Sequence, residues 1–306
     1  MGSNGKIRLY IAGLTALILV IVTVSVLMVL SPGRSVNEGS GTSEPSGTVV
    51  IESAESQAEG MTEQTVRPDD YSSYPLTTVA ECQAVIEAYA ADHGIDPFAY
   101  PVDAANLICS DPGMLDFVLQ YPELIGTQDA PDLSGQIDVS SDVSPLTVPM
   151  YYQYDTRWGY KSYAGSVMGL TGGGPTALSM VATYLLGDNG MNPAWMAGYA
   201  ENNGYITEDG TSWMLMNDGA IGLGIDVTPI TADQDRINRN LDVGNIIVCH
   251  MGPGTFTNTD QYILITGYSE EGYEIRDPGS AVRTSQLWTF ESIAPQMTGC
   301  WVMRIL

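Results

Sequence analysis

The chain has 306 residues, with 36 acidic side chains against 11 Lys and Arg, and its formal net charge is −25. A surface this negative repels phosphate groups, which excludes nucleic acid and anionic membrane surfaces as partners of the soluble part of the chain. Otherwise the acidity indicates solubility and gives no information about the fold.

Residues 9–30 form an uncharged, almost wholly apolar run. As a helix at about 1.5 Å per residue, the run is roughly 33 Å long, close to the hydrocarbon thickness of a bilayer. Lys6 and Arg8 precede it and only Arg34 follows closely, so we expect residues 1–8 in the cytoplasm and the soluble part outside the cell. A cleaved signal peptide is the alternative, but its apolar core is usually shorter and no A-x-A-like site follows. The sequence therefore predicts a single-pass protein of the plasma membrane.

The composition changes abruptly after this run. Residues 31–72 are rich in Ser, Gly, Thr, Glu and Pro and contain few apolar residues. Such a segment cannot bury enough surface to offset its loss of conformational entropy, so we expect a disordered linker with an r.m.s. reach of roughly 35 Å. A second polar segment, residues 127–145, is also predicted to be a linker.

Between these two segments, residues 73–126 have a helical pattern. Apolar residues from position 79 to 90 recur at intervals of three and four, which predicts one apolar helix face. Two shorter helices are expected at residues 102–109 and 111–121. We therefore predict a small helical module.

Residues 146–306 are predicted to form the main domain. Helix signals come first and strand-like runs follow, without the alternation of strand and helix that builds a parallel sheet, so we expect an α+β fold. The predicted helices are residues 175–186, 193–203 and 233–241, and the predicted strands are residues 246–251, 261–268 and 301–305.

The chain contains four cysteines and no C-x-x-C pair, so no metal site is predicted. Cys82 and Cys109 lie in the helical module, whereas Cys249 and Cys300 lie on or beside two strands of the main domain. In an exported chain this distribution predicts the disulfides Cys82–Cys109 and Cys249–Cys300. Buried free thiols are the alternative.

The main domain also carries a series of short motifs in a recognisable order. These are residues 148–153, 155–159, 171–176, 201–205, 210–213, 251–254, 266–268 and 276–278. In this order and spacing they resemble the papain-like peptidases that process bacteriocin leaders (cysteine peptidase family 39-like). The resemblance implies a papain-like fold, in which helices pack on an antiparallel sheet.

The resemblance also implies where a catalytic site would lie. Such a site needs a cysteine at a helix N-terminus, a histidine base, an Asn or Asp that orients the base, and a Gln that binds the oxyanion. The last two roles fall on Asp277 and Gln153. The nucleophile position, however, is Gly173, and the base position is Gln261. Glycine has no attacking group and glutamine transfers no proton near neutral pH, so we expect no peptidase activity.

The sequence offers no other residues to replace the missing cysteine nucleophile and histidine base. The two histidines are His93, at a helix end, and His250, which follows Cys249 on one strand. Neighbouring strand residues point to opposite faces, so Cys249 and His250 form no dyad and both are predicted to be structural. Thr176 lies in the helix without a base to activate it, and nothing in the spacing supports an acid pair of Asp277 with Asp260.

The hypothesis that follows is an extracellular pseudo-peptidase without a cofactor that holds a peptide or a cell-envelope ligand. Loss of the cysteine side chain is expected to open room in the cleft, where the helix N-terminus favours an anion. The candidate ligand-binding residues are Gly172, Gly173, Gly174, Trp158, Trp213 and Gln261. For the two tryptophans, packing in the core or in the cleft wall is the preferred interpretation. One alternative is a structural subunit of an envelope complex with a vestigial cleft. A second is that the chain is classed with the peptidases by resemblance alone.

Overall fold

The computed structural model describes residues 70–129, 137–207 and 210–305. The predicted membrane span and most of the predicted tether lie outside these ranges. Within the described residues, no helix has the length and apolar character needed to cross a bilayer. The last residues assigned to the tether begin a short 3-10 helix, Tyr71–Ser73, whose tyrosine ring is buried, so order begins slightly earlier than predicted.

Three helices occupy the segment expected to be helical. They are α2 (Val79–His93), α3 (Ala104–Ser110) and α4 (Leu115–Leu124). A reciprocal capping box of Thr78 and Glu81 begins α2, and Gly94 ends it in the left-handed conformation that favours glycine. These local signals explain why α2 could be located from the sequence.

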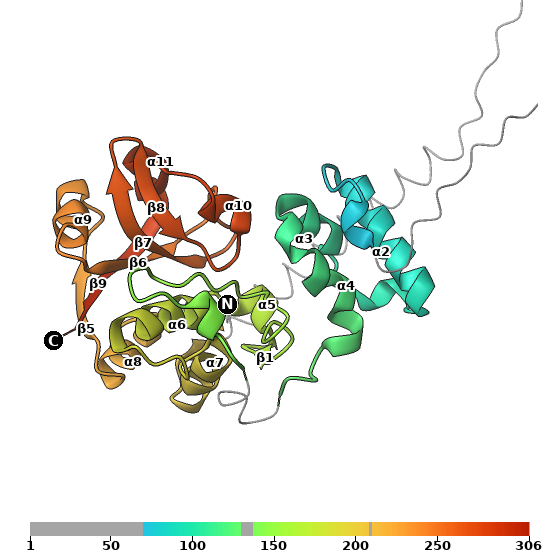
Figure 1. Ribbon diagram of the computed structural model, residues 1–306, viewed down its shortest axis with the longest axis horizontal. Helices are drawn as coiled ribbons and strands as arrows, with labels where there is room; N and C mark the ends of the chain where they lie inside the picture. Colours follow the sequence, from blue (N-terminus) through green and yellow to red (C-terminus); the bar gives the residue numbers. More distant parts are fainter. Residues whose placement is uncertain (1–69, 130–136, 208–209, 306) are drawn as a thin grey trace, which may run out of the picture. The chain divides into compact units, whose positions relative to one another are not determined.

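The remainder of the described chain is an α+β structure built on one antiparallel sheet, as predicted (Figure 1). The sheet order is β5 (Asp226–Ile230), β9 (Met297–Arg304), β6 (Ile246–Met251), β7 (Gln261–Ser269) and β8 (Gly272–Arg276). Two short hairpins join β1 (Ser162–Tyr163) to β2 (Ser166–Val167) and β3 (Ile206–Thr207) to β4 (Gly210–Thr211). The helices of this part are α5 (Met168–Thr171), α6 (Gly173–Leu186), α7 (Pro193–Asn202), α8 (Asp218–Gly222), α9 (Gln234–Leu241), α10 (Ala281–Thr284) and α11 (Phe290–Ile293).

The central strands are buried on both faces, which explains their continuous apolar runs. On β6, Ile246 and Val248 pack in the core shared with α6 and α7, whereas Ile247 and Cys249 pack in the core on the opposite face. The same alternation continues on β7 and β9. Cys249 and His250 therefore point to opposite faces, as expected from strand geometry.

The helical segment shares a core with the rest of the described chain. Phe117 of α4 stacks on Tyr160 with ring centroids 5.2 Å apart, and a Cβ at Gly169 would overlap the Phe117 ring. Further along, the backbone N–H of Val282 donates to the buried Asp111 carboxylate at 3.3 Å. The helices α2 to α4 are therefore packed against the sheet-bearing part.

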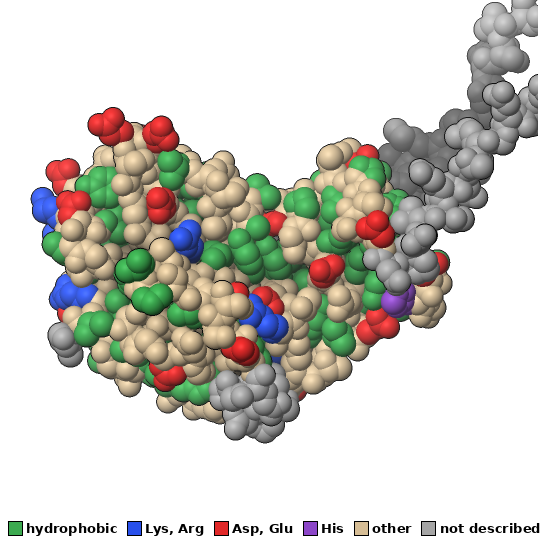
Figure 2. Space-filling view, viewed as in Figure 1, with side chains coloured by type: hydrophobic (Ala, Val, Ile, Leu, Met, Phe, Trp, Pro, Cys, Tyr) green, Lys and Arg blue, Asp and Glu red, His purple; other side chains and the backbone are tan. Residues whose placement is uncertain are grey.

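The later residues of the predicted second linker are also packed. Val139 is buried, and a short 3-10 helix, Ser140–Asp142, follows it. Arg157 binds the Asp142 carboxylate at 2.7 Å and the Asp155 carboxylate at 2.6 Å, which ties this segment to the domain. Figure 2 shows the other acidic side chains scattered over the visible face, as expected of charge that serves solubility.

The two predicted disulfides are wrong for this structure, because all four cysteines are free thiols. The predicted proximity holds, since Cys249 and Cys300 are directly opposed on β6 and β9. Their sulfur atoms, however, are 3.7 Å apart, as in a thiol–thiol contact, whereas a disulfide bond is about 2.05 Å long. Contact with Cys300 and burial raise the pKa of the Cys249 thiol. Burial, with Cys109 nearby, raises the pKa of Cys82 to about 11.

The packing of Phe117 yields the first prediction. Phe117→Ala should lower the free energy of unfolding by about 3–5 kcal/mol, because it empties a closed site between α4 and the sheet-bearing part. Phe98→Ala is the matched control, since Phe98 is 94% exposed and its loss should change stability by less than about 0.5 kcal/mol. Urea denaturation followed by circular dichroism measures both, and equal losses would contradict the shared core.

Candidate functional site

The four positions that resemble a peptidase site come together at the N-terminus of α6. Gly173 begins this helix, and a Cβ built on it would overlap Gln261 Oε1 and lie 3.1 Å from Gln153 Oε1. A Cβ on Gly279 would overlap Gln261 Nε2 and lie 3.4 Å from Asp277 Oδ1. Residues more than a hundred positions apart in the sequence therefore converge on one centre.

The space beside Gly173 is filled. The carboxamide of Gln261, the first residue of β7, occupies the volume that a side chain at position 173 would need. The expectation that loss of the cysteine side chain opens room is thus wrong, because the longer glutamine at the base position reaches into that room. Gly173 and Gln261 are sterically complementary.

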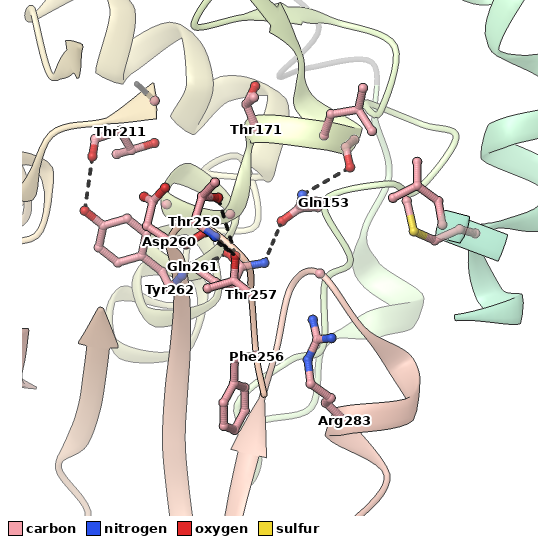
Figure 3. A pocket seen from close by; sticks show the side chains of 18 residues that line it. Gln153, Thr171, Thr211, Phe256, Thr257, Thr259, Asp260, Gln261, Tyr262 and Arg283 are labelled. Carbon is pink, nitrogen blue, oxygen red and sulfur yellow. Dashed lines mark hydrogen bonds between the residues drawn. The ribbon is translucent and has the colours of Figure 1, made fainter. Parts of the chain in front are cut away.

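A chain of amide hydrogen bonds holds this carboxamide (Figure 3). Tyr262 N–H donates to Gln261 Oε1 at 2.9 Å, Gln261 Nε2 donates to Gln153 Oε1 at 3.2 Å, and Gln153 Nε2 donates to the Gly169 carbonyl at 3.1 Å. The backbone N–H at one end and the carbonyl at the other fix the orientation of both amides, because each nitrogen must face an oxygen. Gln153, the expected oxyanion donor, is only 6% exposed and is part of this chain.

Asp277 is committed to other partners. Its side chain is fully buried, Oδ2 accepts from Arg283 Nε at 2.6 Å, and Oδ1 accepts from Gly279 N–H at 2.8 Å. Burial raises the pKa of the Asp277 carboxyl above its ordinary value, while the Arg283 guanidinium opposes that rise. The acid that would orient a catalytic base therefore neutralises an arginine instead, and this arginine has no counterpart in the sequence prediction.

A cavity of about 240 Å³ opens at this centre. Its lining combines glycines and glutamines of the centre with a ring of Thr side chains, two aromatic residues, Asp260 and Arg283, and it includes Leu107 and Met114 from the helical segment (Figure 3). The lining residues are Leu107, Met114, Gln153, Gly169, Leu170, Thr171, Gly173, Gly174, Gly210, Thr211, Phe256, Thr257, Thr259, Asp260, Gln261, Tyr262, Gly279 and Arg283.

The other predicted ligand contacts lie outside this lining. Trp158 has no exposed surface, and its indole N–H donates to the Tyr152 carbonyl at 2.8 Å, so it belongs to the core. Gly172 is the N-cap of α6, where a Cβ would crowd the Met168 side chain. Trp213 is 45% exposed and packs on His250, 5.0 Å between ring centroids. Only Gly173, Gly174 and Gln261 of the predicted set line the cavity.

His250 forms a polar cluster beside the cavity that the sequence did not indicate. Its Nδ1 lies 2.5 Å from Thr298 Oγ1, and its Nε2 lies 3.3 Å from Asp260 Oδ2. Asp260 is a cavity residue, so this cluster fixes one wall of the cleft. Asp260 lies ten residues after His250 and Thr298 lies 48 residues after it, and no motif joins the three, which is why sequence reasoning assigned His250 only a structural role.

Comparison with known proteins gives little similarity at the sequence level. No protein-family model matches the chain, and no curated protein matches it. Among solved structures, it is similar to the peptidase domain of Streptococcus ComA, described as a bifunctional ABC transporter involved in a quorum sensing pathway. That likeness has 21% identity and a TM-score of 0.37, and covers 45% of this chain and 93% of the ComA domain.

The steric relation between positions 173 and 261 can be tested by stability. Gly173→Ala should cost about 1–3 kcal/mol, because the added methyl group overlaps the Gln261 carboxamide. Combining it with Gln261→Ala should cost much less than the sum of the two single changes, since the overlap is then gone.

Gly198→Ala in α7 is the matched control. No atom lies within 4 Å of a Cβ there, so alanine should be neutral or stabilise by about 0.5–1 kcal/mol. Thermal and urea unfolding of the natural chain and the four variants (Gly173→Ala, Gln261→Ala, the two combined, and Gly198→Ala) give the comparison. Additive effects at positions 173 and 261 would show that the two side chains do not compete for one space.

Proposed function

We propose that this chain is a pseudo-peptidase, with a papain-like cleft of the leader-processing type that binds an extended peptide without hydrolysing it. The observation that supports the proposal is the Gln261 carboxamide lying where the side chain of a nucleophile at position 173 would be. Hydrolysis of this type needs an attacking group beside an imidazole base. Glycine and glutamine supply neither.

Each Thr hydroxyl group of the cavity has a hydrogen-bond partner among the described residues, and none of these partners is a histidine. Thr257 Oγ1 donates to the Asp260 carbonyl at 3.2 Å and lies 3.5 Å from Thr259 Oγ1. Thr171 Oγ1 donates to the Tyr163 carbonyl at 3.0 Å, and Thr211 Oγ1 shares a hydrogen bond with the Tyr163 hydroxyl at 2.9 Å. The hydroxyl that His250 does contact belongs to Thr298, which is not part of the cavity lining. An activated Thr in the cleft is therefore unsupported.

The cleft keeps the features of a binding site. Leu107, Met114, Leu170 and Phe256 supply apolar surface, while amides and hydroxyl groups supply hydrogen bonds. Small-ligand sites typically combine these two kinds of lining. The volume of about 240 Å³ suits a short part of an extended peptide or of a wall peptide, rather than a large cofactor.

The proposal also includes the location of the cleft. With residues 9–30 as a membrane span and residues 31–69 as a tether, the cleft would face the outside of the cell, within reach of secreted peptides and envelope proteins. Both elements lie outside the described residues, so the sequence alone supports this part.

A second candidate is an interaction subunit of an envelope complex with a vestigial cleft. One observation favours it: Phe98 and Val102, in the segment before α3, are almost completely exposed. Large exposed apolar side chains that lie close together often contact a partner. This role would use the helical segment and leave the cavity without a ligand.

The two candidates differ in their response to filling the cavity. Thr259 is an exposed residue of the lining, so Thr259→Trp should block the cleft without disturbing the core. We expect this change to weaken binding of a peptide selected from a library at least tenfold by calorimetry. Gln286→Trp, an exposed position outside the lining, should leave affinity unchanged.

Equal binding by the natural chain and Thr259→Trp would place the peptide elsewhere and favour the interaction role. Loss of binding in Phe98→Ala with Val102→Ala, and not in Thr259→Trp, would have the same meaning.

A further inference from the structure

Each acceptor atom at the centre of the cleft already accepts one hydrogen bond. Gln261 Oε1 and Gln153 Oε1 each accept one hydrogen bond along the amide chain. Both carboxylate oxygens of Asp277 have donors of their own. Each of these oxygens keeps one lone pair, but each is already held by a protein donor.

The donors are also only partly used, and most of the unused ones belong to a single cationic side chain. A glutamine amide nitrogen carries two hydrogens, and within the described chain Gln153 Nε2 and Gln261 Nε2 each donate one. A guanidinium carries five N–H donors, and the described residues use only Arg283 Nε, in the bond to Asp277. Figure 3 shows the two amides and the Arg283 guanidinium around one cavity.

The lining contains one residue of each charge. Arg283 is the cation, whereas Asp260 is the anion and is paired with His250, 3.3 Å from its Nε2. Asp277 offsets the charge of Arg283, so the centre is close to neutral. The choice of ligand group at this centre must therefore come from directed hydrogen bonds. A bidentate acceptor, such as a carboxylate, matches the edge of a guanidinium best.

From these unused donors, most of them on the Arg283 guanidinium, we infer that the centre of the cleft binds a carboxylate, and that the ligand is a peptide whose free C-terminal carboxylate ends there. The two terminal nitrogens of Arg283 and the spare amide hydrogens of Gln153 and Gln261 are its donors. The inference rests on the proposed binding function. It also explains what the replacement of the catalytic pair would achieve. In a peptidase this centre would bind a carbonyl group that is attacked, whereas here it would bind a carboxylate that stays intact.

The test compares two libraries of N-acetylated tetrapeptides with the same sequences, one with free C-terminal carboxylates and one with C-terminal amides. Calorimetry on the full chain should show that the best acid binds at least tenfold more tightly than its amide. In Gln261→Glu, a change of nearly equal size, binding of the acid should weaken at least tenfold more than binding of the amide, because only the acid meets a like charge. Gln286→Glu, outside the lining, carries the same charge change as a control.

A second variant keeps the inference testable if Gln261→Glu does not fold. Asp277→Asn with Arg283→Met removes the buried ion pair as a unit, so neither charge is left unpaired. It should also remove the preference for the acid. If acid and amide bind the natural chain equally well, the carboxylate inference is overturned and the peptide-binding proposal stands. If no peptide of either library binds, the peptide-binding proposal falls as well.

Discussion

The contact between Gly173 and the Gln261 carboxamide is the constraint on which the cleft depends. Only glycine leaves room at the start of α6 for this amide, and the amide in turn joins Gln153 and the backbone of β7 into one hydrogen-bonded chain. Gly279 closes the other side, because a side chain there would overlap the amide nitrogen. The centre is therefore a packed and bonded arrangement of its own, rather than a peptidase site with an atom removed.

The surroundings of this centre come from both parts of the described chain. Phe117 fixes α4 against the sheet-bearing part, and α3 with the turn that follows it brings Leu107 and Met114 to the cavity. Asp111 accepts from Val282 N–H one residue before Arg283. The helical segment thus helps position the residues of the cleft. A ligand in the cavity would contact both the helical segment and the sheet-bearing part.

Much of the fold was predictable because it depends on local signals. Short stretches of sequence are enough to recognise the capping box before α2, the glycine after it and the apolar runs of β6, β7 and β9, which are buried on both faces. The strands β5 and β8 were missed because they lie toward the sheet edges, with fewer buried positions. The disulfides were wrong because spacing predicts which cysteines are neighbours, but not whether a bond forms.

The sequence predicted where the site lies, but it did not predict how its side chains are oriented and paired. Motif order located Gly173, Gln153, Gln261 and Asp277, and the structure brings all four together. What a pattern could not give was the direction of each side chain: that Gln261 reaches toward α6, or that Asp277 pairs with Arg283. Trp158 and Trp213 were ligand candidates for which core or cleft-wall packing was the preferred interpretation, and burial confirms the core for Trp158.

Measuring turnover tests most directly whether the cleft lacks peptidase activity. The natural chain and Gly173→Cys with Gln261→His would be compared on a fluorogenic peptide library under reducing conditions. We expect no cleavage by the natural chain, because its centre holds an amide in place of a thiolate and an imidazole. Cleavage by the natural chain that disappears in Thr259→Trp would contradict it.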